Sequence, residues 1–464
     1  MFCGILLSRI FTTRSLAIWR SSQLDVERVL TRGAGVSLAM RVGTVMLAYG
    51  ANVVLARWLG VSAYGQYLYA LGWAVPLAAV GAFGLDKVSL RFVPAYVARS
   101  ELGKLRGLLS FCMSRGIAGS LLVAVAVGGA VLVGGSYIPD DIRTAVLLGC
   151  GLIPLLVVTR LQSAILLGFK KIASALLHDL LRPALLITAV AAVFAATGAL
   201  SVQVTIAALG VTLLVLALMQ SILVFRSRPA GIGGAQIEFE HKVWASTIRA
   251  MFIIHILDVS MTKIDLILVG AMLDVDTVAV FGVAKRISGL ILFGEVAVTT
   301  VATPIITGLH AESKGSEVDR IISFTARWIL WPTLALAVLG ALLWKPILGM
   351  FGPEYLAGAT TLWILIGAQF LQAIVAPAFI LIAFTGYHNH AARFTALVFV
   401  LHLILNVLGI KFFGMAGAAW AAVITALVWN GLLHGWVWSK LGVSSLPLIR
   451  RSRRPILDDD DALP

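Results

Sequence analysis

The sequence predicts an all-α integral membrane protein with about twelve transmembrane helices. Of its 464 residues, 60% are apolar and 12% are charged, and the mean hydropathy is +0.98. Soluble domains are roughly 45–50% apolar and about 25% charged. A soluble chain of the present composition would have too few polar residues to cover its surface. Soluble enzymes, disordered chains and collagen-like fibres are therefore excluded.

The predicted helices come from long apolar segments. A spanning helix needs about 20 apolar residues, and no segment shows the alternation of a strand. Since helices satisfy their own backbone hydrogen bonds, they suit a lipid environment. In chain order the segments are 33–56, 67–85, 107–134, 144–167, 179–199, 202–225, 244–273, 277–308, 321–350, 358–384, 391–412 and 415–438.

The distribution of basic residues predicts the orientation of the chain. If the N-terminus lies inside, 23 basic loop residues fall on the inner side and 4 on the outer side. This asymmetry is what the positive-inside rule requires, so both termini are expected in the cytoplasm. It also accounts for the net charge of +14, and no nucleic-acid partner is expected. The three cysteines form no close pair, which argues against a disulfide framework or a metal site.

A weak internal repeat divides the chain into two halves. An offset of 214 aligns Leu59 with Leu273, and it also aligns Tyr67 with Phe281. Each half holds six segments, so the halves have the same topology. The expected regions are an N-terminal cytoplasmic or interfacial segment (1–32), two six-helix lobes (33–225 and 244–438), a Pro- and Gly-containing cytoplasmic linker (226–243) and a cytoplasmic tail (439–464).

Short motifs along the chain resemble those of bacterial polysaccharide and O-antigen flippases, which belong to the multidrug/oligosaccharidyl-lipid/polysaccharide exporter superfamily. Residues 56–67 read ARWLGVSAYGQY, similar to the first hairpin of that family. Further matches are GLD at 84–86, RFVP at 91–94, KID at 263–265, FGPEY at 351–355 and FGMAGAA at 413–419. Two departures are Ala279 and Phe281, where the family has Gly and Tyr. The first 30 residues have no counterpart.

The resemblance implies a V-shaped bundle in which the two lobes surround a central cavity. It also implies a transporter, not an enzyme, that flips a polyprenyl-pyrophosphate-linked oligosaccharide across the bacterial inner membrane. Transport would be driven by H⁺ or Na⁺ without a cofactor. The chain contains no GxxxxGK(S/T) loop for ATP. Membrane lipids, and a polysaccharide polymerase and glycosyltransferases, are the further partners that such a role implies.

Nine basic residues fall inside the segments, where a charge costs about 2.5–3.5 kcal/mol at mid-membrane. Three lie near cytoplasmic ends and are expected to reach the interface: Arg160, Arg182 and Arg327. Four lie deeper and are expected to bind substrate in the cavity: Arg41, Arg115, Lys285 and Arg286. Arg249 fits either description. Arginine suits a pyrophosphate because its fork donates two hydrogen bonds.

Acidic residues and one histidine inside the segments are candidates for coupling to the ion. His255, Asp258 and Asp265 follow a spacing that places them on one helix face with Thr262. Glu295 is a further candidate. An alternative for Asp265 is a buried pair with a basic residue from another helix.

Two other functions are alternatives to the flippase. A multidrug/sodium exporter of the same superfamily would move a cationic drug, and its cavity would favour acidic residues over basic ones. A polytopic membrane glycosyltransferase or polymerase would need a sizeable polar loop with carboxylates. The expected outer loops are no longer than about a dozen residues, which disfavours the enzyme.

Overall fold

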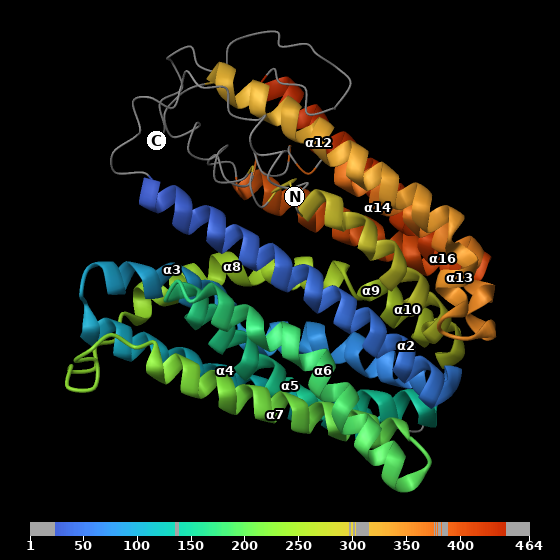
Figure 1. Cartoon of the computed structure of the whole chain (residues 1–464), viewed down its shortest axis with the longest axis horizontal. Helices are drawn as coiled ribbons and strands as arrows, with labels where there is room; N and C mark the ends of the chain where they lie inside the picture. The colour runs from blue at the N-terminus through green and yellow to red at the C-terminus, as the bar shows by residue number, and fades with distance from the viewer. Residues whose placement is uncertain are drawn as a thin grey trace.

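The computed structural model describes residues 24–134, 139–296, 315–374 and 388–441, together with 298, 299, 302, 376, 378 and 382. Every regular element in these ranges is a helix (Figure 1). The predicted all-α fold is thus confirmed. The N-terminal segment predicted at 1–32 and the tail predicted at 439–464 lie for the most part outside the described residues.

The described helices fall into two sets along the chain. Residues 24–226, which we call the first half, hold α2 (Leu24–Ala82), α3 (Leu85–Ala98), α4 (Leu102–Val133), α5 (Asp140–Gly168), α6 (Ile172–Thr197) and α7 (Val202–Arg226). Residues 241–441, the second half, hold α8 (His241–Met261), α9 (Ile264–Met272), α10 (Val275–Gly289), η2 (Leu290–Leu292), α12 (Gly315–Leu342), α13 (Trp344–Gly349), η3 (Pro353–Gly358), α14 (Ala359–Ile374) and α16 (His388–Leu441).

Two of these helices are hairpins that reverse at a single glycine. Gly60 in α2 has φ 74° and Gly414 in α16 has φ 59°, a region that glycine adopts without strain. The Tyr64 hydroxyl donates to Asn52 Oδ1 at 3.0 Å. In a straight helix, residues 12 apart would be separated by about 18 Å, so the chain must turn back at Gly60.

Nine helices in the described ranges are long and apolar enough to cross a membrane. Two of them, 39–82 and 393–439, contain the reversals at Gly60 and Gly414, so each supplies two arms. This agrees with the first two and last two predicted segments.

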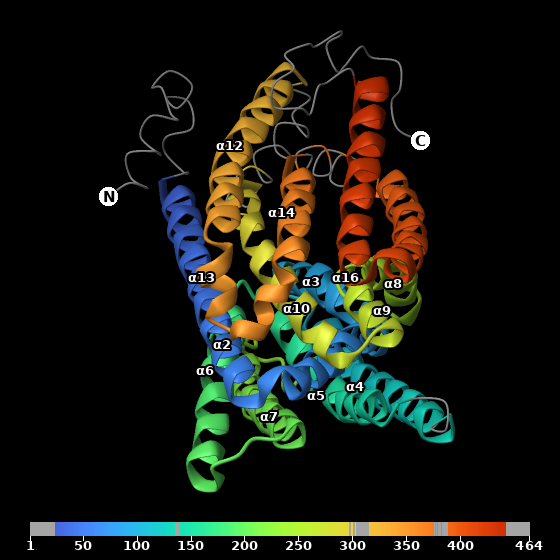
Figure 2. The ribbon, with the colours of Figure 1, turned by 90° about the vertical axis from the view of Figure 1, so that its right-hand side faces the viewer.

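Helices α12, α14 and α16 of the second half form a group apart from the first half, while α8 of the second half packs against α3 of the first half. In Figure 1 the first half (blue to green) lies below α12 and α14, and Figure 2 shows α12, α14 and α16 rising away from α4, α6 and α7. The groups meet where Arg57 Nε of α2 donates to the Met350 carbonyl at 2.6 Å. We call this the Gly60 end. The opposite end holds the connection from α7 to α8.

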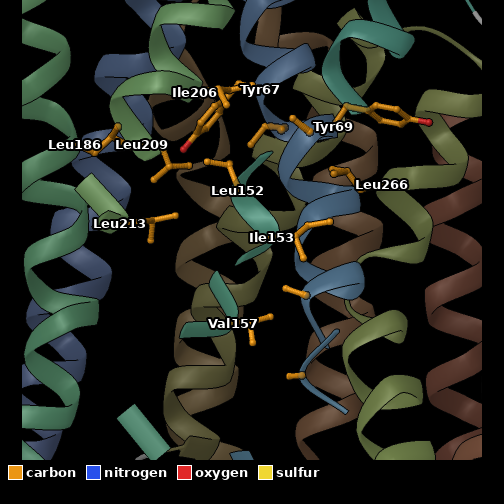
Figure 3. Packing of buried hydrophobic residues seen from close by; sticks show 14 of the residues in the cluster. Tyr67, Tyr69, Leu152, Ile153, Val157, Leu186, Ile206, Leu209, Leu213 and Leu266 are labelled. Atoms are coloured by element: carbon orange, nitrogen blue, oxygen red, sulfur yellow. The ribbon is translucent and has the colours of Figure 1, made fainter. Parts of the chain in front are cut away.

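A continuous apolar core joins the halves. Figure 3 shows Tyr67 and Tyr69 of α2 with Leu152 of α5 and Leu266 of α9. All four belong to one cluster of buried residues. Close contact between α2 and α10 depends on small residues: a Cβ built on Gly65 would lie 1.8 Å from the Val275 carbonyl oxygen. We call this contact the α2–α10 joint.

The structure differs from the predicted segments in two places. Residues 86–106 fall between two predicted segments, but most of them form α3 and the start of α4. Segment 244–273 is longer than a spanning helix needs, which predicts tilt, a kink or an extension, and the structure divides it into α8 and α9 at Thr262 and Lys263. The shared helix face predicted for His255, Asp258 and Asp265 is therefore absent.

Candidate functional site

The break between α8 and α9 carries a buried ion pair. Asp265 lies in the first turn of α9 and is only 3% exposed. Its Oδ1 accepts a hydrogen bond from the backbone N–H of Leu266 at 2.9 Å. Lys285 of α10 binds both oxygens of the Asp265 carboxylate, and its Nζ also donates to the Thr262 carbonyl at 2.9 Å. The Lys285 ammonium thus bridges the end of α8 and the start of α9.

Further cations surround this pair. Lys263 lies in the break, within electrostatic range of Lys285, Arg286 and Arg182. The charges of Arg286 and Arg182 also act on the buried phenol of Tyr67. We call Arg182, Lys263, Asp265, Lys285 and Arg286 the central charge cluster. It joins α6 of the first half to α9 and α10 of the second half.

Arg41 extends the cluster along α2. Its charge acts on Asp179 of α6, as does that of Arg182. His178 Nδ1 lies 3.3 Å from Asp179 Oδ1. The Arg41 side chain is exposed on α2. Two carboxylates, Asp179 and Asp265, thus face five cations in this part of the described structure.

A polar group of α16 lies beside the cluster. His402 is 5% exposed and is within electrostatic range of Asp265 and Lys285. Its Nδ1 lies 3.0 Å from the Thr425 hydroxyl on the other arm of α16. Asn406 Nδ2 donates to the His402 carbonyl at 2.9 Å. These residues bring both arms of α16 next to the cluster.

His255 belongs to a different group of charges. Its Nε2 lies 3.8 Å from Asp86 Oδ2 of α3, and the same oxygen accepts from Arg160 Nε at 3.1 Å. Arg160 was expected to reach the interface, but the structure places it against Asp86. We call His255, Asp86 and Arg160 the α3–α8 triad.

The remaining predicted residues lie apart from both groups. Arg115 is exposed on α4, with its guanidinium 6.0 Å from the centre of the Phe111 ring. Arg249 and Asp258 are exposed on α8. Glu295 is half-buried beyond η2. Of the nine predicted residues, the structure brings together Asp265, Lys285 and Arg286, and Arg41 is linked to them only through Asp179 and Arg182 of α6.

Motifs far apart in the sequence come together at the Gly60 end. Besides its bond to Met350, Arg57 reaches the Gly349 carbonyl through Nη2 at 3.4 Å. The rings of Tyr64 and Tyr355 meet edge to face, with centroids 6.4 Å apart. The first hairpin motif and the FGPEY motif therefore form one contact between the halves.

The linker is bound to the first half at the opposite end. Arg106 Nη1 donates to the carbonyls of Gly233 and Ala235, both at 2.8 Å. Lys104 Nζ lies 2.9 Å from Glu240 Oε1, and the Tyr96 hydroxyl donates to Glu240 Oε2 at 2.5 Å. The bonds from Lys104 and then Tyr96 hold the pKa of Glu240 below its ordinary value.

Trp244 and Tyr96 continue this attachment into α8. Trp244 is fully buried, and its Nε1 donates to the Tyr96 hydroxyl at 2.9 Å. Burial, followed by the bond to Glu240, raises the pKa of Tyr96 to about 12. The start of α8 is thus fixed to α3 by neutral groups.

No protein-family model matches the chain. It is similar to the inward-facing conformation of a multidrug resistance MATE family transporter of the MOP superfamily, with TM-score 0.69 and 15% identity over 87% of this chain and 97% of the other. It is also similar to the lipid II flippase MurJ in an inward closed conformation, with TM-score 0.68 and 16% identity over 86% of each chain. The chain has the MOP superfamily fold.

A curated relative comes from the sequence comparison. It is the probable low-salt glycan biosynthesis flippase Agl15 of Haloferax volcanii, 27% identical over 175 residues. The match spans about a third of each protein, 37% of this chain and 36% of the relative.

Within the MOP fold, several residues of the two groups were not identified as site residues from the sequence. Asp86 falls between the predicted segments 67–85 and 107–134, and Lys263 stands in the sequence only as part of the KID match. His402 had no signal beyond its place in an apolar segment. Arg182 and Asp179 had a detectable signal, because a carboxylate three residues before an arginine forms a pair on a helix.

Proposed function

We propose that this protein flips a polyprenyl-pyrophosphate-linked oligosaccharide across a bacterial inner membrane for polysaccharide or O-antigen export, driven by a proton or sodium gradient. The observation that carries the proposal is the excess of positive charge where the halves meet. Among the described residues there, five cations face two carboxylates. A dianionic pyrophosphate complements that surplus.

The chemistry of the cations supports an anionic cargo. Uncompensated charge at this depth is costly unless water or a counter-ion reaches it. A guanidinium fork donates two parallel hydrogen bonds to a phosphate, and an ammonium acts as a point charge. Arg41, Arg182 and Arg286 supply forks, and Lys263 and Lys285 supply ammonium groups. The long prenyl tail would remain in the lipid while the head group occupies this site.

Asp265 has a defined part in the proposal. When no cargo is bound, its carboxylate neutralises Lys285. A pyrophosphate that binds Lys285 competes with Asp265 and leaves the carboxylate free to take a proton or Na⁺. Cargo and coupling ion would then be linked through one ammonium group.

The second candidate is a multidrug exporter of the same superfamily. The MOP fold suits that role equally well, as the MATE family transporter illustrates. A cationic drug would be repelled by the central charge cluster, which favours the lipid-linked cargo. The name of the glycan relative agrees with that preference.

A flipping assay in proteoliposomes tests the proposal. A fluorescent polyprenyl-pyrophosphate oligosaccharide is supplied, and its arrival in the outer leaflet is measured with a membrane-impermeant quencher. Lys263→Gln and Arg286→Gln leave the Asp265–Lys285 pair intact. Each should slow flipping about tenfold to a hundredfold, since a charged hydrogen bond contributes about 1.5–3 kcal/mol.

Control variants distinguish the effect of charge in the central charge cluster from the effect of charge elsewhere on the protein. Lys411→Gln removes an exposed lysine of α16 and should flip normally. Arg286→Lys should lie between Arg286→Gln and the natural protein. Ethidium uptake by the same vesicles tests the rival. Transport of ethidium without flipping of the lipid would overturn the proposal in favour of a drug exporter.

A further inference from the structure

The α3–α8 triad is a buried charged group that the proposed cargo site does not use. His255 is 3% exposed and Asp86 is 4% exposed. His255 lies 14 residues into α8, about 21 Å along the helix at 1.5 Å per residue. The triad joins α8 of the second half to α3 and α5 of the first half. It is thus a contact between the halves, deep in the bundle.

The triad has unused hydrogen-bonding capacity on two atoms that lie near each other. Arg160 binds only Oδ2 of Asp86, and Asp86 Oδ1 is buried with no hydrogen-bond partner in the described structure. His255 Nε2 is also buried and lacks a hydrogen-bond partner there. At 3.8 Å from Asp86 Oδ2 it is too distant for a good hydrogen bond. An unpaired carboxylate oxygen in such a place is destabilising.

One proton would give His255 Nε2 a hydrogen to donate to the Asp86 carboxylate. Protonation at Nε2 makes His255 a charged donor that faces the Asp86 carboxylate. A charge-assisted hydrogen bond is shorter and stronger than a neutral one. It would draw α8 onto α3. The proton is taken from water and is returned to water, and no other bond is made or broken.

Burial and four nearby charges act on the protonation of His255. Asp86 of α3 and Asp258 of α8 attract the imidazolium. Arg160 of α5 and Lys87 of α3 repel it. Burial of the imidazole also disfavours its charged form, so proton uptake depends on the attraction of the Asp86 carboxylate. The Asp86 carboxylate lies 3.8 Å from His255 Nε2.

We propose that His255, Asp86 and Arg160 form a proton-binding site, separate from the cargo site, that links proton uptake to the contact between α8 and α3. Since His255 is buried when the helices touch, its proton can exchange with water only when they separate. Proton exchange is therefore tied to a relative movement of the two halves.

Histidine NMR of the full-length protein in lipid nanodiscs tests the proton site without any transport measurement. Protein labelled with ¹⁵N-histidine is titrated from pH 5 to pH 8.5. One imidazole signal should titrate and should be missing in His255→Gln. Asp86→Asn should lower the proton affinity of that signal about tenfold, because it removes the nearest negative charge. His241→Gln, on the same helix, is the matched control and should leave the His255 titration unchanged.

A folding defect in Asp86→Asn would not end the test. The double variant Asp86→Asn/Arg160→Gln removes both charges of the pair and leaves no unpaired ion, and it should still weaken proton binding relative to the natural protein. A His255 signal that does not titrate, or that titrates identically without Asp86, overturns the inference.

The link to movement rests on the proposed function and is measured separately. In the natural protein the flipping rate should differ between pH 6 and pH 8. In His255→Gln the rate should be the same at both pH values. An unchanged pH profile in His255→Gln overturns the link. If His255 titrates as expected but no lipid-linked glycan is flipped, the proton site stands and the proposed function falls.

Discussion

At the scale of single residues, the position of Asp265 decides what Lys285 can do. The carboxylate is buried, and the ammonium reaches it from another helix while also binding the Thr262 carbonyl. Removing one partner of a buried ion pair leaves the other charge uncompensated. The sequence left two roles open for Asp265, ion coupling and a structural pair. In the structure Asp265 is paired with Lys285, as the structural role requires.

Asp265→Asn should therefore destabilise the protein, by about 3–5 kcal/mol if the site stays dry. The double variant Asp265→Asn/Lys285→Gln should recover much of the loss because no charge is left unpaired. Thermal unfolding in detergent, followed by size-exclusion chromatography, measures both. Asp258→Asn changes an exposed carboxylate and serves as the control. An Asp265→Asn protein as stable as the natural one, but uncoupled from the ion, would favour the coupling role alone.

At the scale of elements, the linker between α7 and α8 is a bound segment, not a loose tether. Glu238 N donates to the Gly103 carbonyl at 3.1 Å, and Arg106 holds two carbonyls of the linker. Gly107 makes this approach possible, because a Cβ there would lie 2.0 Å from the Glu238 carbonyl oxygen. The sequence predicted the linker from its Pro and Gly residues, but their contacts depend on tertiary packing.

Gly107→Ala should loosen the linker, even though alanine favours a helix by about 1 kcal/mol over glycine. The added methyl group must displace backbone, which is harder than moving a side chain. Gly129→Ala on the same helix has no atom within 4 Å of the new Cβ and should be neutral or stabilising. Limited proteolysis within 227–240 compares the two. Equal resistance in both variants would contradict the bound linker.

The hydrogen bonds to Glu240 predict that the stability of the folded protein depends on pH. Because Lys104 and Tyr96 lower the pKa of Glu240, the folded protein binds the proton less tightly than the unfolded chain. This contribution to stability is complete above the ordinary glutamate pKa, and it is lost as the pH falls through the lowered value. Unfolding temperatures between pH 7 and pH 3 should drop less steeply in Glu240→Gln. Parallel curves for the two proteins would refute this.

At the scale of the whole molecule, the α2–α10 joint holds the halves together. Leu68 contacts Gly282, where a Cβ would lie 2.5 Å from Leu68 Cδ1. These two positions are 214 residues apart, the offset of the predicted repeat. Aligned residues meet at a twofold axis, so the contact is what such an axis would produce. The repeat and the lobe boundaries built on it stay predictions.

Gly65→Ala should disturb the joint, since its Cβ would overlap the Val275 carbonyl. We expect a loss of about 1–3 kcal/mol, typical of overpacking, together with a wider distance between the halves. Gly50→Ala lies on the same helix with nothing within 4 Å of the new Cβ and is the control. Spin labels on exposed positions of α7 and α14 report the distance. An unchanged distance and stability would show that the joint tolerates a methyl group.

The sequence predicted the apolar helices well because hydropathy acts over whole segments. It could not predict the break at Thr262 and Lys263, since the break is stabilised by Lys285 from another helix. For the same reason Asp86 was overlooked: its partners Arg160 and His255 are 74 and 169 positions away along the chain. Arg41 and Arg286 could be identified from the sequence because a charged residue within a long apolar segment is rare. Which cations share a site depended on the packing of helices.

Because the reversal at Gly60 is a single residue, the two arms of α2 cannot move apart at that end. One arm carries Arg41, and the other carries Tyr67 and packs on α10. A connection of a single residue lets the arms pivot but does not let them slide or drift apart. A tilt imposed on Arg41 by a bound anion would therefore be transmitted to the surface that joins the halves. The connection between the halves at the other end is longer, 14 residues from Ser227 to Glu240, and it is bound to the first half.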